Sequence, residues 1–467
     1  MLSIYCENKN SIVVQNNNQQ YTYAEFFKIV ESFKGLFNDA HVKRVVIDLP
    51  QSFDAYAIMW AAYLSEVTFC CIKYDNPESY KQKCIASFQP DIIFNRQMLS
   101  NCFESNATPT IISYTSGYEN SFDERRIAYV LFTSGSTGEP KGVKVKRVAL
   151  EHFVEWCFSH YSLQPGQVYG QYSNISFDLG VGDVFFGISR GANMIPIDGL
   201  NKLIPAQIIK KYKINFWHSV PSVIDLMIKH KTLNSDNLKS VFEFTFCGET
   251  LYTSQVKQIF DAIPSVTVWN TYGPTEATIF CSAIKLNCYN YTEFSRETVS
   301  LGEPLDGFDF ILSPYEYNDE IIIKSAYIAE GYLGSDYTGG FLNDSDENYF
   351  SAFQTGDIVK KEDGLLFFVG RKDTQVKVNG FRIDLNEIDY TIRKHFNIAS
   401  CSILHENEII TMVEAENLTA KMIFSVLIEE LPKYYLPKKI MTTNGLPKNS
   451  NGKISKKRVL DMILCNL

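Results

Sequence analysis

The sequence lacks the features that mark secreted, membrane-spanning and nucleic-acid-binding proteins. Its 467 residues begin without a basic segment followed by an apolar run, and no window approaches the ~18 uninterrupted apolar residues of a membrane-spanning helix. Positive charge is in the minority, since 44 Lys and Arg face 53 Asp and Glu and the net charge is −9. A nucleic-acid surface needs clustered Lys and Arg, so we expect neither a nucleic acid nor a membrane as partner.

Zinc-binding and disulfide patterns are missing as well. The 11 cysteines are odd in number and irregularly spaced, and no group of Cys and His has zinc spacing. Such cysteines are typical of free thiols in a reducing compartment. The adjacent Cys70 and Cys71 lie in the apolar stretch EVTFCCIKY, which predicts a core strand rather than a redox site. We therefore expect a cytoplasmic protein.

Strands and helices alternate along most of the chain. The apolar runs 44–50 and 91–95 are typical of buried strands, and 54–66 between them has helical length and periodicity. Alternation of this kind indicates an α/β fold, with parallel sheets covered by helices. The polar tract QNNNQQ at 15–20 is expected to form a turn between a strand and a helix.

The charge balance changes near residue 372. From residue 373 onward, 13 Lys and Arg face 11 Asp and Glu, whereas the chain as a whole carries a net charge of −9. The sequence therefore predicts two domains, a large N-terminal one over 1–371 and a small C-terminal one over 372–467.

The loop Thr133–Gly142, TSGSTGEPKG, packs glycines, hydroxyls and one lysine between two apolar segments. The runs 128–132 and 143–146 on either side have strand patterns. A Walker A loop opens directly into a helix, whereas Lys141 leads into a strand, so this loop is not of that type. Glycines let backbone N–H groups approach an anion, which predicts a polyphosphate-binding loop. A plain polar surface turn is the alternative.

Six further motifs accompany this loop, in a fixed order. Together the seven resemble the signatures of the adenylate-forming enzyme superfamily and cover essentially the whole chain. The resemblance implies a large N-terminal domain of helix-covered β-sheets and a small, mobile α+β C-terminal domain. The accompanying motifs are YTYAEF (21–26), MWAAYLSEVTFCCIKYDNP (59–77), NTYGPTEATI (270–279), FQTGDIVK (353–360), GRKDTQVKVNGFRIDLNEID (370–389) and LPKNSNGKISKKRVL (446–460).

The resemblance implies ATP and Mg²⁺ as cofactors. A carboxylate is repelled by ATP, so its attack on the α-phosphorus needs charge screening and positioning. By resemblance, Tyr272 stacks on adenine, Thr275 touches the α-phosphate and Glu276 helps to hold Mg²⁺. Asp357 is expected to bind the ribose hydroxyls, with Arg371 nearby. The residues assigned to ATP are Thr133, Ser134, Gly135, Ser136, Thr137, Gly138, Lys141, Gly248, Asn270, Tyr272, Gly273, Thr275, Asp357 and Arg371.

The C-terminal motifs imply a second half-reaction in the same pocket. Lys453, in NGK, resembles the lysine that bridges the substrate carboxylate and the phosphate during adenylation; a solvated surface charge is the alternative. Lys372 and Asp373 match the hinge about which the C-terminal domain turns in this superfamily. Gly380 matches the loop that lines the tunnel for a pantetheine thiol, where a missing side chain leaves room. Lys453 and Gly380 are therefore the predicted catalytic residues.

The segment SFDLGVGDVFF (176–186) carries the information on substrate class. Members that activate amino acids have an Asp after the Phe of this motif, and Asp178 follows Phe177 here. Its carboxylate is expected to pair with the substrate ammonium, because a buried cation without a counter-charge is costly. A helix cap is the alternative role for Asp178.

Two glycines distinguish this segment from the D-alanine-activating members that it most resembles. Gly180 and Gly182 stand where those members have a Ser and a bulky side chain, so we expect a wider pocket than one for alanine. A medium-sized neutral or aromatic amino acid fits this expectation, as does an ortho-aminobenzoate. His218 has the alternative of a hydrogen-bonded core residue. The predicted substrate wall comprises Phe177, Asp178, Leu179, Gly182, His218, Thr245, Cys247, Thr271, Ile279 and Phe280.

Three functions stay open on the sequence. The first is a freestanding amino acid adenylating enzyme that passes its product to a separate phosphopantetheinylated carrier protein, as in nonribosomal peptide or related secondary metabolism. The second is an acyl- or aryl-CoA synthetase, and the third is a non-catalytic nucleotide-binding relative. Asp178 favours the first over the second. The joint presence of Lys141, Glu276, Asp357 and Lys453 weighs against the third.

Overall fold

The computed structural model describes residues 9–16, 19–105, 122–133, 140–334, 339–343, 350–415, 418–447 and 454–465. The chain divides into two compact units, which are described one at a time. Unit 1 comprises 1–74, 87–131 and 142–370, and unit 2 comprises 75–86, 132–141 and 371–467. The sequence did not indicate that two short N-terminal segments belong to unit 2, and the domain limits 1–371 and 372–467 stay a prediction.

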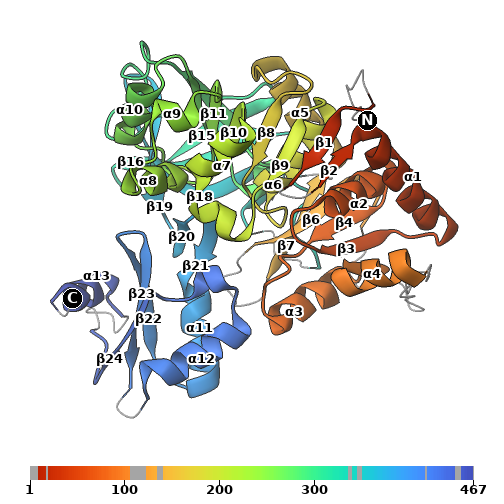
Figure 1. The fold of residues 1–467 in the computed structure, drawn as a ribbon. Coiled ribbons are helices and arrows are strands. Elements are labelled where there is room, and N and C mark those ends of the chain that lie inside the picture. The colour runs from red at the N-terminus through yellow and green to blue at the C-terminus, as the bar shows by residue number, and fades with distance from the viewer. Residues whose placement is uncertain are drawn as a thin grey trace. The chain divides into compact units, whose positions relative to one another are not determined.

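The largest sheet of unit 1 has nine strands in the order β14-β13-β12-β11-β10-β8-β9-β1-β2. Its centre is parallel, as the pairs β8–β10, β10–β11 and β11–β12 show (Figure 1). The strands are β1 (Ile12–Gln15), β2 (Gln20–Thr22), β8 (Val168–Gln171), β9 (Asn193–Pro196), β10 (Phe216–Ser219), β11 (Glu243–Phe246), β12 (Thr267–Tyr272), β13 (Ser282–Leu286) and β14 (Glu303–Pro304).

The central strands of this sheet are buried on both faces. Side chains alternate along a strand, and Phe216 belongs to one hydrophobic core while its neighbour Trp217 belongs to another. The first core includes residues of α5 (Arg147–His160) and α6 (Asp178–Ser189), and the second includes residues of α7 (Pro205–Tyr212), α8 (Ser222–Lys229) and α10 (Thr253–Ala262). All four residues of FWHS in β10 and of EFTF in β11 are buried as a result of this double coverage.

A second sheet of unit 1 confirms the strands expected from the early apolar runs. Its order is β5-β3-β4-β6-β7, and β3 (Arg44–Asp48) pairs in parallel with both β4 (Thr68–Cys71) and β5 (Ile92–Asn95). Cys70 and Cys71 are buried in β4, as predicted. The other two strands are β6 (Ile127–Thr133), which pairs with β4, and β7 (Lys141–Lys146) at the edge of the sheet. These two strands flank the glycine-rich loop, as its sequence predicts.

The predicted helix at 54–66 is α2 (Phe53–Leu64), which begins after the N-cap Ser52. It is buried over most of its surface, which explains its apolar composition. Its neighbour α1 (Tyr23–Asp39) begins with a capping box between Thr22 and Glu25. The other N-terminal helices are α3 (Glu78–Phe88) and α4 (Arg96–Ser105), and the short helices of unit 1 are η1 (Gly199–Leu203), α9 (Ser235–Leu238) and η2 (Thr275–Ala277).

The polar tract at 15–20 differs from its prediction. It lies between β1 and β2, which pair antiparallel, so its described ends belong to a hairpin rather than to a strand-to-helix turn. The second strand of this hairpin, β2, has only three residues and leads directly into α1. So short a strand has too few alternating positions to be recognised in the sequence.

The last sheet of unit 1 is antiparallel. Its order is β15-β16-β18-β17, and β19 also pairs with β18. The strands are β15 (Phe308–Tyr315), β16 (Asn318–Ser325), β17 (Phe341–Asn343), β18 (Phe350–Glu362) and β19 (Leu365–Arg371).

Unit 2 has the α+β composition expected for the C-terminal domain. Its elements from residue 371 onward are a hairpin and a three-stranded sheet with helices, around two small apolar cores. They are β20 (Gln375–Val378), β21 (Phe381–Asp384), α11 (Leu385–Phe396), β22 (Ser400–His405), β23 (Glu408–Glu414), α12 (Ala420–Glu430), η3 (Lys433–Tyr435), β24 (Lys439–Thr443) and α13 (Lys456–Leu464). The predicted fold class is thereby confirmed.

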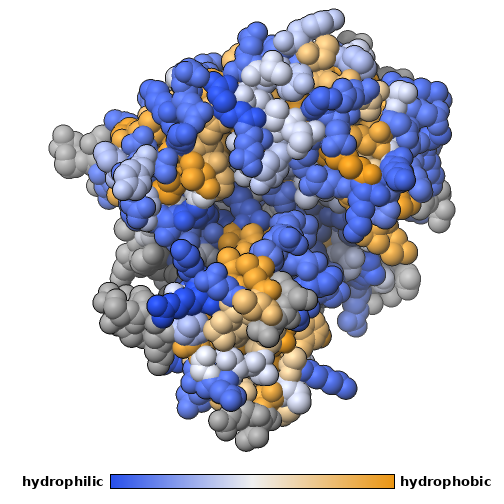
Figure 2. Space-filling view, turned by 90° about the vertical axis from the view of Figure 1, so that its left-hand side faces the viewer, coloured by the Kyte–Doolittle hydropathy of each residue, from blue (hydrophilic) through white to orange (hydrophobic). Residues whose placement is uncertain are grey.

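Hydrophilic residues predominate on the face drawn in Figure 2, where hydrophobic residues form separate clusters. Among the described helices, none is both long enough and apolar enough to cross a bilayer.

Candidate active site

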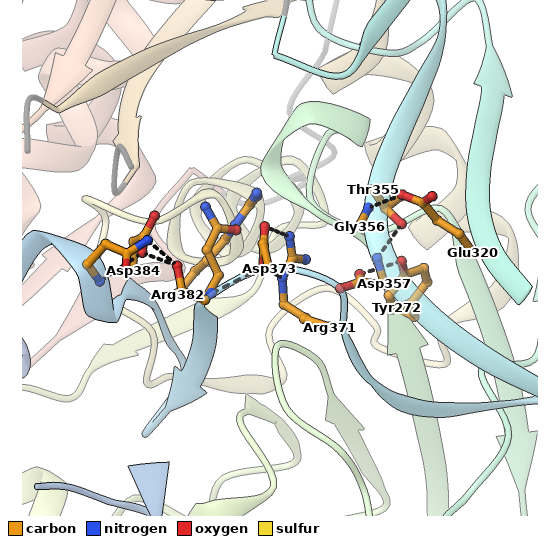
Figure 3. Close-up of polar contacts among 12 residues, drawn as sticks. Tyr272, Glu320, Thr355, Gly356, Asp357, Arg371, Asp373, Arg382 and Asp384 are labelled. Atoms are coloured by element: carbon orange, nitrogen blue, oxygen red, sulfur yellow. Dashed lines mark hydrogen bonds and ion pairs between the residues drawn. The ribbon is translucent and has the colours of Figure 1, made fainter. Parts of the chain in front are cut away.

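Two residues predicted to bind the nucleotide are joined in the structure. Tyr272 ends β12, Asp357 lies in β18, and the tyrosine hydroxyl donates a hydrogen bond of 2.6 Å to Oδ2 of the aspartate (Figure 3). Both side chains are buried. Burial, and then the charge of Asp357, raise the pKa of Tyr272 well above its ordinary value, so the phenol stays a neutral donor.

A buried glutamate shapes the strand that carries Asp357. Glu320 Oε1 accepts a hydrogen bond of 3.1 Å from the backbone N–H of Gly356, and its Oε2 accepts one of 2.8 Å from Gln354 Nε2. The pairing of β16 with β18 shifts register at this point, and Gly356 has a φ of +74°, a conformation that glycine adopts at low cost. Thr355 Oγ1 accepts from the N–H of Asp357 at 2.9 Å. Glu320 was not predicted, because nothing in NDEIII marks it.

Glu276 lies in η2 with its carboxylate buried. Its Oε1 accepts a hydrogen bond of 2.8 Å from the hydroxyl of Tyr332, and its carbonyl accepts one of 2.8 Å from the N–H of Ala329. Within the described ranges, no group of three or more His, Cys, Asp and Glu is arranged to hold a metal ion. A lone carboxylate suits Mg²⁺, which keeps several waters and binds through one or two carboxylates plus substrate phosphates. Glu276 therefore fits the predicted role.

The backbone after η2 is strained. Thr278 and Ile279 both have positive φ, +60° and +72°, and β-branched residues rarely adopt such values. Gly273 lies opposite, where an added Cβ would come within 2.4 Å of Phe280 Cα. Strain of this kind persists only where surrounding structure enforces it and gathers at functional sites. This turn places the predicted wall residues Ile279 and Phe280.

The remaining predicted nucleotide residues fall in both units. Asn270 Nδ2 donates to the carbonyl of Ser300 at 2.8 Å, and Gly248 has a φ of +89°. Thr133 and Lys141 belong to unit 2, where the threonine hydroxyl donates to the lysine carbonyl at 3.4 Å. Thr275 begins η2. The residues Ser134, Gly135, Ser136, Thr137 and Gly138 lie outside the described residues.

Asp178 is the first residue of α6, and Phe177 is its N-cap. Oδ1 of Asp178 accepts a hydrogen bond of 2.8 Å from the N–H of Leu179, and the helix N-terminus favours a negative charge there. Burial, and then the charge of Asp178, raise the pKa of the buried Tyr129 well above its ordinary value. The position of this carboxylate at the start of the helix is compatible with the predicted pairing with a substrate ammonium.

The strand register brings four predicted wall residues onto one face of the large sheet. His218 pairs with Thr245 across β10 and β11, and Thr245 pairs with Trp269 across β11 and β12. Because side chains alternate, Cys247 and Thr271, two residues further along, share that face. All four wall residues are buried. They lie at the carboxyl ends of parallel strands, where ligands of open α/β sheets bind.

The two glycines of α6 do not open the expected space. A Cβ at Gly182 would lie 2.8 Å from both Ile279 Cδ1 and Phe153 Cε1, so these side chains fill the position. A Cβ at Gly180 would lie 2.2 Å from the carbonyl oxygen of Asn174. The expectation that the missing side chains widen the pocket is therefore wrong at both positions, because neighbouring atoms occupy the space that a side chain would take.

In unit 2, Arg371 and Asp373 form a bidentate pair with both N···O distances at 2.8 Å (Figure 3). Lys372 between them is exposed. Gly380 has a φ of +82° and follows Asn379, at +50°, in the turn between β20 and β21, a combination typical of type I′ hairpins. Its backbone conformation therefore requires glycine, besides the predicted need for room. Lys453 lies outside the described residues.

The sequence of this chain is similar to those of known enzymes. A family model described as AMP-binding enzyme matches residues 6–333, and the chain belongs to this family, as its motifs predict. It is 32% identical over 361 residues to a D-alanine–D-alanyl carrier protein ligase of Bacillus licheniformis, covering 72% of this chain and 71% of the relative. It is 28% identical to the ligase of the same name from Staphylococcus haemolyticus, over 98% of this chain and 97% of the relative.

Solved structures show the same fold. The Vibrio cholerae adenylation domain AlmE, in complex with glycyl-adenosine-5′-phosphate, superposes with a TM-score of 0.84 at 24% identity, covering 98% of this chain and 96% of that one. The amide bond synthetase McbA from Marinactinospora thermotolerans has a TM-score of 0.81 at 17% identity, with 97% of each chain covered.

Proposed function

We propose that this protein activates an amino acid with ATP and transfers it to the phosphopantetheine thiol of a separate carrier protein. The observation that carries the proposal is that two groups of predicted residues lie at the carboxyl ends of β10 to β12. The first is the predicted nucleotide pair, Tyr272 and Asp357. The second is the buried substrate wall, with Asp178 at the start of the neighbouring helix α6. Relatives named D-alanine–D-alanyl carrier protein ligase support it.

In the first half-reaction, the substrate carboxylate attacks the α-phosphorus of ATP and pyrophosphate leaves. Tyr272 offers a ring to the adenine and Asp357 offers carboxylate oxygens to the ribose hydroxyls. Thr275 and the loop that ends at Lys141 are proposed to contact the phosphates. Bound Mg²⁺ would screen phosphate charge, and Glu276 would supply its protein oxygen. Lys453 is proposed to stabilise the charge that develops between the two reacting groups.

Asp178 supports an amino acid over a plain acid. A substrate ammonium that leaves water needs a counter-charge, and the Asp178 carboxylate at the start of α6 supplies one. Its hydrogen bond from Leu179 helps to hold the carboxylate at the start of the helix.

In the second half-reaction, a carrier thiol attacks the acyl carbon and AMP leaves. We propose that the C-terminal domain, 372–467, turns at Lys372 and Asp373 between the two steps, and that the turn at Gly380 lines the path of the thiol. Alternation of this kind separates a water-sensitive step from a thiol-dependent one. The buried thiols among the described cysteines support a reducing, cytoplasmic location.

The test is ATP–pyrophosphate exchange by the purified protein over L- and D-amino acids, aminobenzoates and matched acids without an amine. We expect exchange only with acids that carry an amine. Thioester formation is then measured with a pantetheinylated carrier protein and with coenzyme A, and we expect the carrier protein to be the better acceptor. The proposal would be contradicted if only amine-free acids supported exchange, or if none of the acids did.

A further inference from the structure

A buried polar network lies beneath the predicted substrate wall. His218 Nδ1 is 2.7 Å from Oδ1 of Asp183, a residue of α6, and the hydroxyl of Tyr169 donates to the same oxygen at 2.7 Å. The exposed fractions of His218, Asp183 and Tyr169 are 2%, 1% and 1%. Neither Asp183 nor Tyr169 was predicted from the sequence, and no step of the proposed reaction uses them.

This network fixes which edge of the histidine is available. A carboxylate oxygen accepts hydrogen bonds, so the N–H at Nδ1 of His218 is the donor to Asp183, and this bond holds the ring. Nε2 is then the outward nitrogen. It is fully buried and has no hydrogen-bond partner among the residues that the structure describes. Nearly all buried polar atoms in native proteins have a partner, so this exception needs an explanation.

The position of His218 identifies what could satisfy Nε2. His218 lies on the face of the sheet that carries Thr245, Cys247 and Thr271. Its unsatisfied Nε2 therefore belongs to the wall that the proposed function assigns to the substrate side chain. An apolar substrate side chain would leave this atom unsatisfied.

We propose that the substrate is an amino acid with an uncharged polar side chain, a hydroxyl or a carboxamide, which hydrogen-bonds to His218 Nε2. This inference rests on the proposed function and deepens it. A neutral imidazole offers an acceptor at Nε2 and a protonated one offers a donor. Hydroxyl and carboxamide groups can do either, so the proposal holds for both protonation states. Asp183 and Tyr169 are positioning residues, because they act through the ring of His218.

The test uses pairs of amino acids of nearly equal shape: threonine and valine, serine and 2-aminobutyrate, asparagine and leucine, each as L- and D-forms. ATP–pyrophosphate exchange gives kcat/KM for each. We expect kcat/KM for the polar member of at least one pair to exceed that for its apolar partner by about tenfold or more, since a buried polar group left without a partner is destabilising. Equal values within every pair, or preference for the apolar members, would overturn the proposal.

Two variants locate the effect. His218→Phe keeps a ring but removes Nε2, so the polar-to-apolar ratio of kcat/KM is expected to fall to near one. Asp183→Leu should lower the same ratio through KM more than through kcat, whereas Asp183→Asn, which retains an acceptor for Nδ1–H, should restore part of it. A purely structural role would change both members of a pair equally and leave the ratio unchanged, and that result would overturn the positioning role.

Controls separate the possible failures. His230→Phe makes the same substitution at an exposed histidine of unit 1, and its ratio should equal that of the wild type. Thermal shift on AMP binding checks that each variant is folded. Exchange with amino acids but no polar preference contradicts only this inference. Absence of exchange with every amino acid contradicts the proposed function, and this inference with it.

Discussion

The nucleotide side and the substrate side of unit 1 differ in how their polar groups are satisfied. On the nucleotide side, Tyr272 bonds to Asp357 and Glu276 bonds to Tyr332. On the substrate side, His218 Nε2 is buried without a partner among the described residues. The predicted nucleotide residues thus hold one another before any ligand binds, whereas the predicted substrate wall leaves a buried polar atom to be matched. We infer that the first region serves any substrate and the second selects one.

The largest expected effect is on the substrate side. Asp178→Asn removes the proposed counter-charge of the ammonium, and an uncompensated buried charge costs about 3–5 kcal/mol. We expect kcat/KM for amino acids to fall by about a hundredfold or more, with KM for ATP little changed. Steady-state exchange with each reactant varied in turn measures both. If KM for ATP rose by as large a factor as kcat/KM for amino acids fell, the division between the two sides would be contradicted.

Lys453→Ala should act on the chemical step. We expect amino-acid-dependent exchange to fall at least about tenfold, because a charge that stabilises the transition state is lost. Lys457→Ala changes a nearby lysine of α13 and serves as the matched control. Full exchange activity in the Lys453 variant would refute the role assigned to this residue.

Asp357→Ala tests the nucleotide side alone. The variant removes the partner of a buried tyrosine hydroxyl and the proposed acceptor for ribose, so KM for ATP should rise about tenfold. The ratios between paired polar and apolar amino acids should stay at their wild-type values. A change in those ratios would show that the two regions are coupled.

Glycine substitutions test the close packing of α6. Gly180→Ala places a Cβ against the backbone of Asn174, and overpacking of this kind costs about 1–3 kcal/mol. Gly35→Ala, in α1, meets nothing within 4 Å and should stabilise by up to about 1 kcal/mol. Urea unfolding measures both. Equal stability of the two variants would contradict the packing described here.

The smallest effect is expected at the proposed hinge. Burial raises the pKa of Asp373, but the hydrogen bond and charge of Arg371 outweigh it, so the pKa lies below the ordinary value of 3.8. A lowered acid pKa means that the pair stabilises the fold above pH 3.8 and that this contribution is lost as the pH falls through the folded-state value. The stability difference between wild type and Asp373→Asn should accordingly shrink below that pH. A stability difference that grows as the pH falls would mean that the pKa of Asp373 is raised in the folded state, which contradicts the account.

The sequence motifs singled out Tyr272 and Asp357, which the structure joins, but not Asp183 or Glu320, and the difference has a physical reason. Residues such as Tyr272 and Asp357 stand in contiguous motifs, whose backbone requirements leave a pattern in the chain. Asp183 and Glu320 act through contacts with residues distant in sequence, and no local spacing marks them. The glycines of α6 were misjudged because a missing side chain is compatible with a cavity or with close packing, and only the neighbouring Ile279 and Asn174 decide between these.

Exchange with amino acids and their deaminated analogues tests the central claim most directly. Each amino acid of the panel is compared with the acid of the same carbon skeleton without its amine, in one assay of ATP–pyrophosphate exchange on the purified protein. The account predicts exchange with at least one amino acid and none above background with its analogue. Equal exchange with both, or exchange only with the analogues, would contradict it.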